Sequence, residues 1–328
     1  MNVPELILED VSMIWDGAPH CAFTDLARYK AKWYCAFREG KAHAWCPGKI
    51  RVLASTDGEK WETAFVLSAR STDYRDPKLA PGPGGSLELV VGVTRLKGGR
   101  PEGRHSAALR TLDGVSWSTP AQIGGEGDWI WRTERNGGET WGISYRLPGK
   151  RRWTVHLMRS ADGRAWSDHV RLKVPGLPNE ATVRFCGEAA IALVRREAKG
   201  GEAWIGKSGS PFSEWEWTGC GERVGGPNFL IAPPGTLYAE RTPDDAVKPE
   251  PEMIAATRLW NGRTPRTSVC LMRAGKLIPL LDLPSAGDCG YPGMVLHRGK
   301  LWVSYYSSHE GRARIYLARV KIRKARRL

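Results

Sequence analysis

The sequence lacks cysteines arranged to form a disulfide framework or to bind a metal ion. Its seven cysteines are an odd number, lie scattered along the chain and form no C-x-x-C pair. We therefore expect reduced, mostly buried thiols rather than a disulfide framework or a zinc site. A Gly-rich phosphate loop, H-E-x-x-H and G-x-S-x-G are absent too. These patterns imply no metal and no cofactor.

Long apolar runs are also missing. No stretch is long enough to span a membrane. The first ten residues carry Glu5, Glu9 and Asp10 instead of the basic start and apolar run of a signal peptide. We expect a cytoplasmic protein with no membrane partner, and the sequence says nothing about its oligomeric state.

Acidic residues are scarcer than basic ones. The 328-residue chain has 35 Asp and Glu against 49 Lys and Arg, which gives a formal net charge of +14. A basic balance suits anionic partners such as acidic sugars, nucleic acid or a membrane surface. A solvated basic surface explains the same balance. Because no nucleic-acid-binding motif is present, we expect no nucleic-acid partner.

One short pattern is repeated. The sequence [S/T]-x-D-G-x-x-W occurs at residues 55–61, 111–117 and 160–166, each time after an apolar run. Copies about 50 residues apart are typical of solenoids, propellers and arrays. Each copy reads as a β-turn in which Asp accepts hydrogen bonds from nearby amides and Gly adopts a positive φ. We expect Trp61, Trp117 and Trp166 to be largely buried beneath their turns.

This pattern resembles a shortened form of the Asp-box of sialidases (neuraminidases) and related BNR-repeat β-propellers. In that family the box joins the third and fourth strands of a blade and lies away from the active site. Short strand-like runs between Gly, Pro and Asp turns, without a long helical period, fit such an all-β fold. The resemblance implies a single six-bladed β-propeller domain over residues 1–328, closed by pairing of residues 6–8 near the last strand. We place the blades at 20–68, 74–124, 129–174, 178–223, 226–284 and 288–322, with a Pro-rich, acidic insertion at 242–252 and a solvated basic tail at 321–328.

Alternating strand direction predicts which residues share a face. If the repeated turns lie on one face, the starts of the innermost strands and the ends of the second strands lie on the other. Arginine recurs at these second-strand ends in five blades, and its planar fork matches a carboxylate. For any single arginine, a structural ion pair with Asp25, Asp76 or Glu310 is as good an explanation as substrate binding. Convergence of the whole set at the centre of the ring favours substrate binding. The predicted substrate-binding residues are Arg38, Arg75, Asp76, Arg132, Arg195, Arg196, Arg258 and Arg266.

Two segments resemble the catalytic strands of the sialidase superfamily. Residues 178–196 are similar to the blade that carries the family's buried glutamate, which corresponds here to Glu180. Residues 290–293 look like the strand that bears the nucleophilic tyrosine, which corresponds to Tyr291. Residues 266–271 are similar to a segment with a binding arginine, and residues 75–77 open blade two as in many sugar-processing propellers.

The resemblance implies an exo-acting glycoside hydrolase that removes a terminal, carboxylate-bearing sugar. Tyr291 would attack the anomeric carbon, and Glu180 would take the proton of the phenol. A neutral nucleophile avoids repulsion by an anionic sugar. His43 would be the general acid, and Glu39 or Asp76 would replace it if His43 does not reach the substrate.

Blade one departs from the family, because residues 22–26 read Ala-Phe-Thr-Asp-Leu where sialidases have Phe/Tyr-Arg-Ile-Pro. Two alternatives therefore stay open. One is a lyase that β-eliminates beside a uronic acid, with His43 or Tyr291 taking the C5 proton. The other is a glycan-binding propeller without chemistry. In every case the expected partner is an acidic glycan or oligosaccharide.

Overall fold

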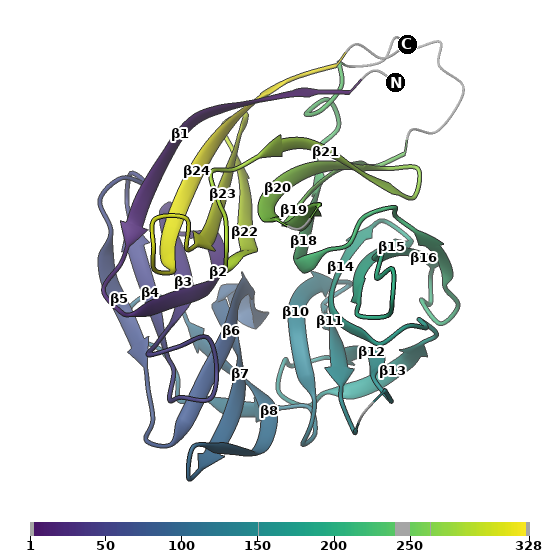
Figure 1. Ribbon diagram of the computed structural model, residues 1–328. Coiled ribbons are helices and arrows are strands. Elements are labelled where there is room, and N and C mark those ends of the chain that lie inside the picture. Colours follow the sequence, from purple (N-terminus) through teal and green to yellow (C-terminus); the bar gives the residue numbers. More distant parts are fainter. Residues whose placement is uncertain (1–2, 150, 240–249, 263, 326–328) are drawn as a thin grey trace.

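The computed structural model describes residues 3–149, 151–239, 250–262 and 264–325, which form six four-stranded antiparallel sheets arranged in a ring (Figure 1). The prediction of an all-β, six-bladed propeller is confirmed. No helix among these residues is long and apolar enough to cross a membrane. Most of the insertion predicted at 242–252 lies outside the described residues.

The strand bounds match the six predicted blades. A single 3-10 turn, Pro83–Gly85, interrupts the strands in blade two. Blade one contains β2 (His20–Tyr29), β3 (Lys32–Gly40), β4 (Lys49–Ser55) and β5 (Glu62–Leu67), and blade two contains β6 (Thr72–Pro81), β7 (Leu87–Lys97), β8 (Arg100–Thr111) and β9 (Ala121–Ile123). Blade three contains β10 (Trp129–Asn136), β11 (Glu139–Arg146), β12 (Thr154–Ser160) and β13 (Ser167–Leu172), and blade four contains β14 (Pro178–Cys186), β15 (Ala189–Arg196), β16 (Trp204–Gly209) and β17 (Glu216–Gly219). Blade five contains β18 (Gly225–Ala232), β19 (Glu252–Asn261), β20 (Thr264–Arg273) and β21 (Lys276–Asp282), and blade six contains β22 (Cys289–His297), β23 (Lys300–Ser307), β24 (Arg314–Arg323) and β1 (Glu5–Trp15).

The two ends of the chain close the ring in blade six. Strand β1 is the outermost strand of that sheet and pairs antiparallel with β24, so that Leu6 lies opposite Ile322 and Leu8 opposite Val320 (Figure 1). The predicted closure is confirmed. It pairs an edge of blade six that would otherwise be open.

The basic side chains of the tail are exposed, but its backbone is paired. Lys321, Arg323 and Lys324 are exposed, which agrees with the prediction of a solvated tail. Lys321 to Arg323 belong to β24, and the amide of Ala325 donates a hydrogen bond to the carbonyl of Leu237 at 2.9 Å, so the backbone is held to blade six and to the segment after β18. Residues 326–328 lie outside the described part of the chain.

The repeated turns join the third and fourth strands of blades one to three, as expected. In the first, Oδ1 of Asp57 accepts hydrogen bonds from the amides of Glu59 and Lys60 at 2.8 and 2.9 Å. These bonds lower the pKa of Asp57 to about 2, because they favour the charged carboxylate. Gly58 has φ of 81°, which a residue with a Cβ adopts only under strain.

The three tryptophans of these turns are half-buried, so the prediction that they are largely buried is wrong. The indole N–H of Trp61 donates to the carbonyl of Gly58 at 3.2 Å, and that of Trp166 donates to Gly163 at 3.3 Å. The rings therefore fold back under their turns as expected. They remain partly exposed because each turn leads into the outermost strand of its blade, where no further strand covers the ring.

The strand registers place the repeated turns on the face opposite to the predicted site. In blade one, Ser55 at the turn pairs with Trp33 at the start of β3, whereas Arg38 near the end of β3 pairs with Ile50 at the start of β4. The β3–β4 loop and the start of β2 therefore share the other face, which we call the site face.

All six innermost strands carry a β-bulge near their start. In each, two residues lie opposite one residue of the second strand, which exposes side chains to the centre of the ring. Phe23, Asp76 and Tyr291 lie in these bulges with φ of 61°, 47° and 52°. Strained backbone of this kind clusters at functional sites. The bulged pairs are Phe23-Thr24, Asp76-Pro77, Trp131-Arg132, Asn179-Glu180, Gly226-Pro227 and Tyr291-Pro292.

The cysteines are all free, and five of the seven are buried. Burial is the main cause that raises the pKa of Cys21 to about 12 and the pKa of Cys220 to about 11. These thiols are therefore neutral and act as small apolar side chains. The expectation that the cysteines are mostly buried is confirmed.

Candidate active site

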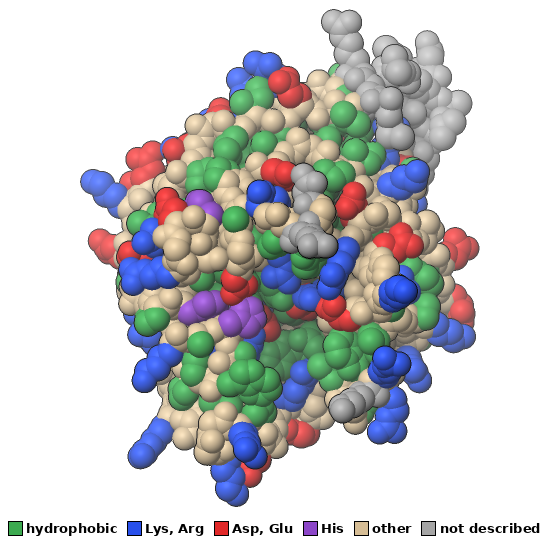
Figure 2. Space-filling model, viewed as in Figure 1, with side chains coloured by type: hydrophobic (Ala, Val, Ile, Leu, Met, Phe, Trp, Pro, Cys, Tyr) green, Lys and Arg blue, Asp and Glu red, His purple; other side chains and the backbone are tan. Residues whose placement is uncertain are grey.

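The site face is hollowed at the centre of the ring, with charged and apolar side chains gathered around the hollow (Figure 2). A cavity of about 520 Å³ opens there, and we call it the pocket. Its walls come from the innermost strands, from the β3–β4 loop and from the β7–β8 hairpin. The side chains that line it include Trp45, Arg75, Asp76, Arg104, Trp129, Tyr145, Glu180 and Tyr291.

Tyr291 and Glu180 meet at the wall of the pocket, as predicted. The hydroxyl of Tyr291 donates a hydrogen bond of 2.6 Å to Oε1 of Glu180. The other carboxylate oxygen accepts from Nη1 of Arg195 at 2.8 Å and from the amide of Gly226 at 2.8 Å. Arg195 Nη1 also lies 3.1 Å from the hydroxyl of Tyr291. The phenol, the carboxylate and the guanidinium thus form one closed network, although Tyr291 on β22 belongs to blade six and Glu180 and Arg195, on β14 and β15, belong to blade four.

This network sets the charges of its members. Burial raises the pKa of Glu180, but Arg195 and the hydroxyl of Tyr291 outweigh it, so the net pKa is lower than usual. Burial, followed by the negative charge of Glu180, raises the pKa of Tyr291 well above its ordinary value. At neutral pH the site therefore holds a neutral phenol hydrogen-bonded to an ionised carboxylate, which is the arrangement of a nucleophile and its base.

Asp76 lies in the bulge of β6 and lines the same pocket. Its Oδ2 accepts from the indole N–H of Trp129 at 3.2 Å, whereas Oδ1 is buried and has no hydrogen-bond partner among the described residues. A buried, unpaired carboxylate oxygen is costly unless a ligand or a proton satisfies it. Asp76 is therefore available to a substrate.

Arg104 was not predicted, although it lines the pocket. Its guanidinium stands over the rings of Trp129 and Tyr145, with its Cζ 4.8 and 5.1 Å from their centroids. Two of its nitrogens, Nε and Nη2, are buried without a hydrogen-bond partner in the described structure. The sequence search considered the ends of second strands, whereas Arg104 lies near the start of the third strand, β8. Its neighbours Gly103 and His105 give no motif that would have revealed it.

Trp45 was also missed. It lies in the β3–β4 loop with 68% of its surface exposed, a high value for this side chain, and has φ of 62°. An exposed tryptophan beside a pocket offers a flat apolar surface to a sugar ring. The sequence did contain a signal, because Trp45 follows His43 in the same loop. Only the charged residues and the histidine of that loop were considered as candidates.

Arg75 and Arg258 lie beside Tyr291. Arg75 lines the pocket, stands over the ring of Phe23 with its Cζ 4.9 Å from the centroid, and lies 3.5 Å from Oδ2 of Asp73. Arg258 stands over the ring of Tyr291 at 5.4 Å, and its Nη1 donates to the carbonyl of Cys289 at 3.2 Å. Arg75 and Arg104 line the pocket together with the acidic residues Asp73, Asp76, Glu102 and Glu180, while Arg195 and Arg258 lie next to it against Glu180 and Tyr291.

Four predicted binding arginines lie elsewhere, so the predicted convergence of the full set is wrong. Arg38 is fully buried, and its Nε donates to Asp73 at 2.7 Å. It holds the β3–β4 loop in place, because its Nη1 donates a hydrogen bond to the carbonyl of Ala42 at 2.8 Å. Arg196 turns away from the pocket, donating to the carbonyl of Pro175 and stacking on Trp204. Arg266 donates to the carbonyl of Pro265 and does not line the pocket.

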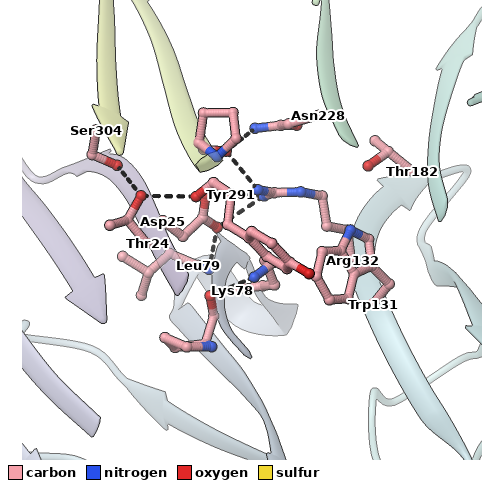
Figure 3. Close-up of polar contacts among 12 residues, drawn as sticks. Thr24, Asp25, Lys78, Leu79, Trp131, Arg132, Thr182, Asn228, Tyr291 and Ser304 are labelled. Carbon is pink, nitrogen blue, oxygen red and sulfur yellow. Dashed lines mark hydrogen bonds and ion pairs between the residues drawn. The ribbon is translucent and has the colours of Figure 1, made fainter. Parts of the chain in front are cut away.

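Arg132 points down the central channel instead of into the pocket. Its Nη1 lies 2.9 and 3.0 Å from the two carboxylate oxygens of Asp25, and its Nη2 donates to the carbonyl of Pro292 at 3.0 Å (Figure 3). Lys78 lies beside this pair, over the ring of Trp131 at 4.4 Å (Figure 3). Asp25 and Arg132 line a second cavity of about 420 Å³, further along the innermost strands. Arg132 is therefore structural, which is the alternative considered for any single arginine.

The two other predicted acids, His43 and Glu39, do not line the pocket. Glu39 is buried, and it pairs with Lys49 at 3.0 Å and with Arg51 at 3.1 Å. His43 is half exposed, and its Nδ1 lies 2.7 Å from Oδ2 of Asp288. The ring of Phe23 contacts both His43 and Tyr291, with centroid distances of 5.1 and 5.0 Å. Of the three predicted acids, only Asp76 lines the pocket with Tyr291.

Several solved structures have a similar architecture. A protein of unknown function from Dyadobacter fermentans superposes with a TM-score of 0.81 at 19% identity, covering 98% of this chain and 100% of that one. Penicillium chrysogenum α-L-arabinanase complexed with arabinobiose gives 0.70 at 12%, covering 96% and 98%. Trypanosoma rangeli sialidase in complex with sialic acid gives 0.64 at 13%, covering 95% and 57%. The chain has the six-bladed propeller fold of these proteins.

At these identities the likeness shows the propeller fold alone. The chain also spans little more than half the length of the sialidase, with 57% of that chain covered. No protein-family model matches the sequence, and no curated protein sequence matches it. The chemistry of this propeller therefore depends on the side chains of its own pocket.

Proposed function

We propose that the protein is a glycoside hydrolase that removes a terminal acidic sugar, with Tyr291 as the nucleophile. The observation that carries the proposal is the 2.6 Å hydrogen bond from the hydroxyl of Tyr291 to Glu180 at the wall of the pocket. A tyrosine with an ionised carboxylate as its acceptor is poised for proton transfer at the moment of attack.

The first step forms a covalent glycosyl–tyrosine. The phenol oxygen of Tyr291 bonds to the anomeric carbon as the bond from that carbon to the leaving oxygen breaks, and the phenol proton passes to Glu180. Arg195 touches both groups and stabilises the negative charge that they share. A neutral phenol also approaches an anionic sugar without the repulsion that a carboxylate nucleophile would meet.

Asp76 is the general acid in this mechanism. Its Oδ1 has no hydrogen-bond partner in the described structure, and the residue lines the same pocket as Tyr291. As a carboxylic acid it would give its proton to the leaving oxygen. When water then releases the sugar from Tyr291, the carboxylate of Asp76 would take a proton from the water, and Glu180 would return its proton to the phenol oxygen. Asp76 takes the role predicted for His43, because Asp76 lines the pocket with Tyr291 and His43 does not.

The structural neighbours support this class of reaction. They include a sialidase with sialic acid, a sialidase with difluorosialic acid described as a covalent intermediate, an α-L-arabinanase and a β-1,3-galactosidase. Each acts on sugars within a similar fold. The guanidinium groups of Arg75 and Arg104 in the pocket, with those of Arg195 and Arg258 beside Glu180 and Tyr291, support an acidic sugar over the neutral ones.

The products of cleavage test this proposal. The full chain is incubated with glycans that end in sialic or uronic acids, and both new reducing ends and ultraviolet absorbance are followed. Hydrolysis produces reducing ends without absorbance, which we expect. A lyase would create a double bond that absorbs in the ultraviolet, and the pair of His43 with Asp288 at 2.7 Å is the observation that would favour it. Binding without any cleavage would show a propeller that has no chemistry.

Arg104 provides a test of anion recognition. Replacing it in Arg104→Ala removes a guanidinium with two unpartnered nitrogens from the pocket. Hydrogen bonds to charged groups contribute about 1.5–3 kcal/mol, so we expect the Kd for an acidic sugar to rise about 10-fold to 100-fold. Calorimetric titration with a uronic acid, and with the neutral sugar of the same configuration, measures the effect.

The control for this variant is Arg266→Ala, since Arg266 lies outside the pocket. It should leave the Kd for the acidic sugar unchanged. If Arg104→Ala weakens the acidic and the neutral sugar equally, the pocket does not recognise the carboxylate through Arg104.

A further inference from the structure

A second cluster of chemical groups lies on the site face, outside the pocket. His20 opens β2, His43 lies in the β3–β4 loop and Asp288 directly precedes β22. Nε2 of His20 lies 2.9 Å from Oδ2 of Asp288, and Nδ1 of His43 lies 2.7 Å from the same oxygen. One ligand atom from each of the three side chains lies within 4.8 Å of the other two.

The surrounding structure fixes these side chains. The hydroxyl of Tyr306 donates to Oδ1 of Asp288 at 2.7 Å, so the carboxylate presents Oδ2 to the two imidazoles. The loop that carries His43 is held by Arg38, which donates to the carbonyl of Ala42 at 2.8 Å and to that of Cys46 at 3.4 Å. Hydrogen bonds that orient a ligand in this way are typical of metal sites.

We propose that His20, His43 and Asp288 bind a divalent transition-metal ion, with Zn²⁺ as the best fit. Two imidazoles and one carboxylate are ligands that Zn²⁺ accepts, and three protein ligands with one open position are typical of its non-structural sites. The side chains are 13%, 48% and 31% exposed in the order His20, His43, Asp288, so solvent reaches the cluster. Water or an oxygen of a ligand takes the open position.

The geometry requires only small movements. Four ligands at about 2.1 Å from Zn²⁺ in a tetrahedron stand about 3.4 Å from one another. The two imidazole nitrogens now lie 2.9 and 2.7 Å from the carboxylate oxygen. Each of these two contacts therefore opens by less than about 1 Å, as the metal replaces the hydrogen bonds that now join the rings to the carboxylate. The two ring nitrogens, which lie within 4.8 Å of each other, close by less than about 1.5 Å.

The metal site is independent of the proposed hydrolase chemistry, because it uses none of the pocket's residues. It lies next to them, since the ring of Phe23 contacts both His43 and Tyr291. An ion there would add a positive charge at the edge of the pocket. It would hold a water molecule or an oxygen atom of a long substrate on that side.

Zn²⁺ binding by the full chain, freed of metal by a chelator, tests this inference in calorimetric titrations. We expect saturable binding of one Zn²⁺ per chain to the wild type. His43→Ala should weaken this binding by more than about 100-fold, because it removes a ligand, whereas Tyr306→Phe should weaken it about 10-fold by releasing Asp288. Since His43 is half exposed, His43→Ala should keep the circular dichroism spectrum and the Tm of the metal-free wild type.

The matched control is His297→Ala, at the opposite end of β22 from Asp288. It should bind Zn²⁺ as the wild type does, which separates the site from scattered histidines and thiols. Absence of saturable binding by the wild type would overturn the inference. An affinity in His43→Ala equal to that of the wild type would overturn it as well.

Discussion

Tyr291→Phe should lower kcat by at least about 10³-fold, since it removes the oxygen that forms the bond to the sugar. The substitution deletes one hydroxyl and keeps the ring, which packs against Phe23, Trp131 and Tyr306. Binding of the substrate should change by less than about 3-fold, or about 0.6 kcal/mol. Single-turnover kinetics and calorimetric titration with the same acidic substrate separate the two effects.

Tyr305→Phe is the matched control for this prediction. Tyr305 is the neighbour of Tyr306 on β23, and its hydroxyl donates to the carbonyl of Pro284 at 3.0 Å, outside the pocket. The same chemical change there should cost about 1 kcal/mol of stability and leave kcat near the wild-type value. If Tyr291→Phe cleaves at the wild-type rate, Tyr291 is not the nucleophile.

Asp25→Ala should lower the free energy of unfolding by about 3–5 kcal/mol, because it breaks a buried ion pair and leaves one charge behind. Asp25 is 1% exposed and accepts hydrogen bonds from Arg132 and, at 2.7 Å, from the amide of Leu79. Without the carboxylate, the guanidinium of Arg132 keeps only the carbonyl of Pro292. Denaturant unfolding followed by tryptophan fluorescence measures the change.

The control is an ion pair of the same type at the surface. Asp16 pairs with Arg312 at 2.9 Å, and both side chains are nearly half exposed. Asp16→Ala should therefore change the stability by less than about 1 kcal/mol. Equal losses from Asp25→Ala and Asp16→Ala would mean that the buried pair does not hold the innermost strands together.

The propeller could be predicted because its signals are local. The repeated turns depend on hydrogen bonds within seven residues, such as those from the amides of Glu59 and Lys60 to Asp57. A turn whose hydrogen bonds all lie within a few residues has the same sequence pattern in any blade. Repetition of the pattern therefore shows that the fold is built from repeated units. The alternation of strand direction then placed Tyr291 and Glu180 on one face.

The partners of individual arginines could not be predicted in the same way. Arg132 lies in the bulge of an innermost strand and pairs with Asp25 in the channel, whereas Arg195 lies near the end of a second strand and binds Glu180 of its own blade at the pocket. Asp25 is two blades away from Arg132, and Tyr291, which Arg195 also contacts, is two blades away from Arg195. The sequence alone does not give the positions of such distant side chains. Buried ion pairs and binding residues also use the same residue types.

The same limit applies to the cluster of His20, His43 and Asp288. The sequence separates His43 from Asp288 by 245 residues and His20 from Asp288 by 268. Short metal-binding motifs report ligands on one turn or one helix, and none exists here. Only the closed ring, which places blade six beside blade one, brings the three side chains together.

Covalent labelling of Tyr291 tests the central claim most directly. Fluorinated sugars with a fluoride leaving group, such as 2,3-difluorosialic acid and 2-fluoroglucuronosyl fluoride, are incubated with the wild type and with Tyr291→Phe. Attack by the phenol breaks the bond to fluoride, and the neighbouring fluorine slows release of the sugar. Mass spectrometry of the digested protein should find one glycosyl group on the peptide that contains Tyr291, and none in Tyr291→Phe. A label on another residue, or rapid cleavage of the parent glycoside without any label on Tyr291, would contradict the account.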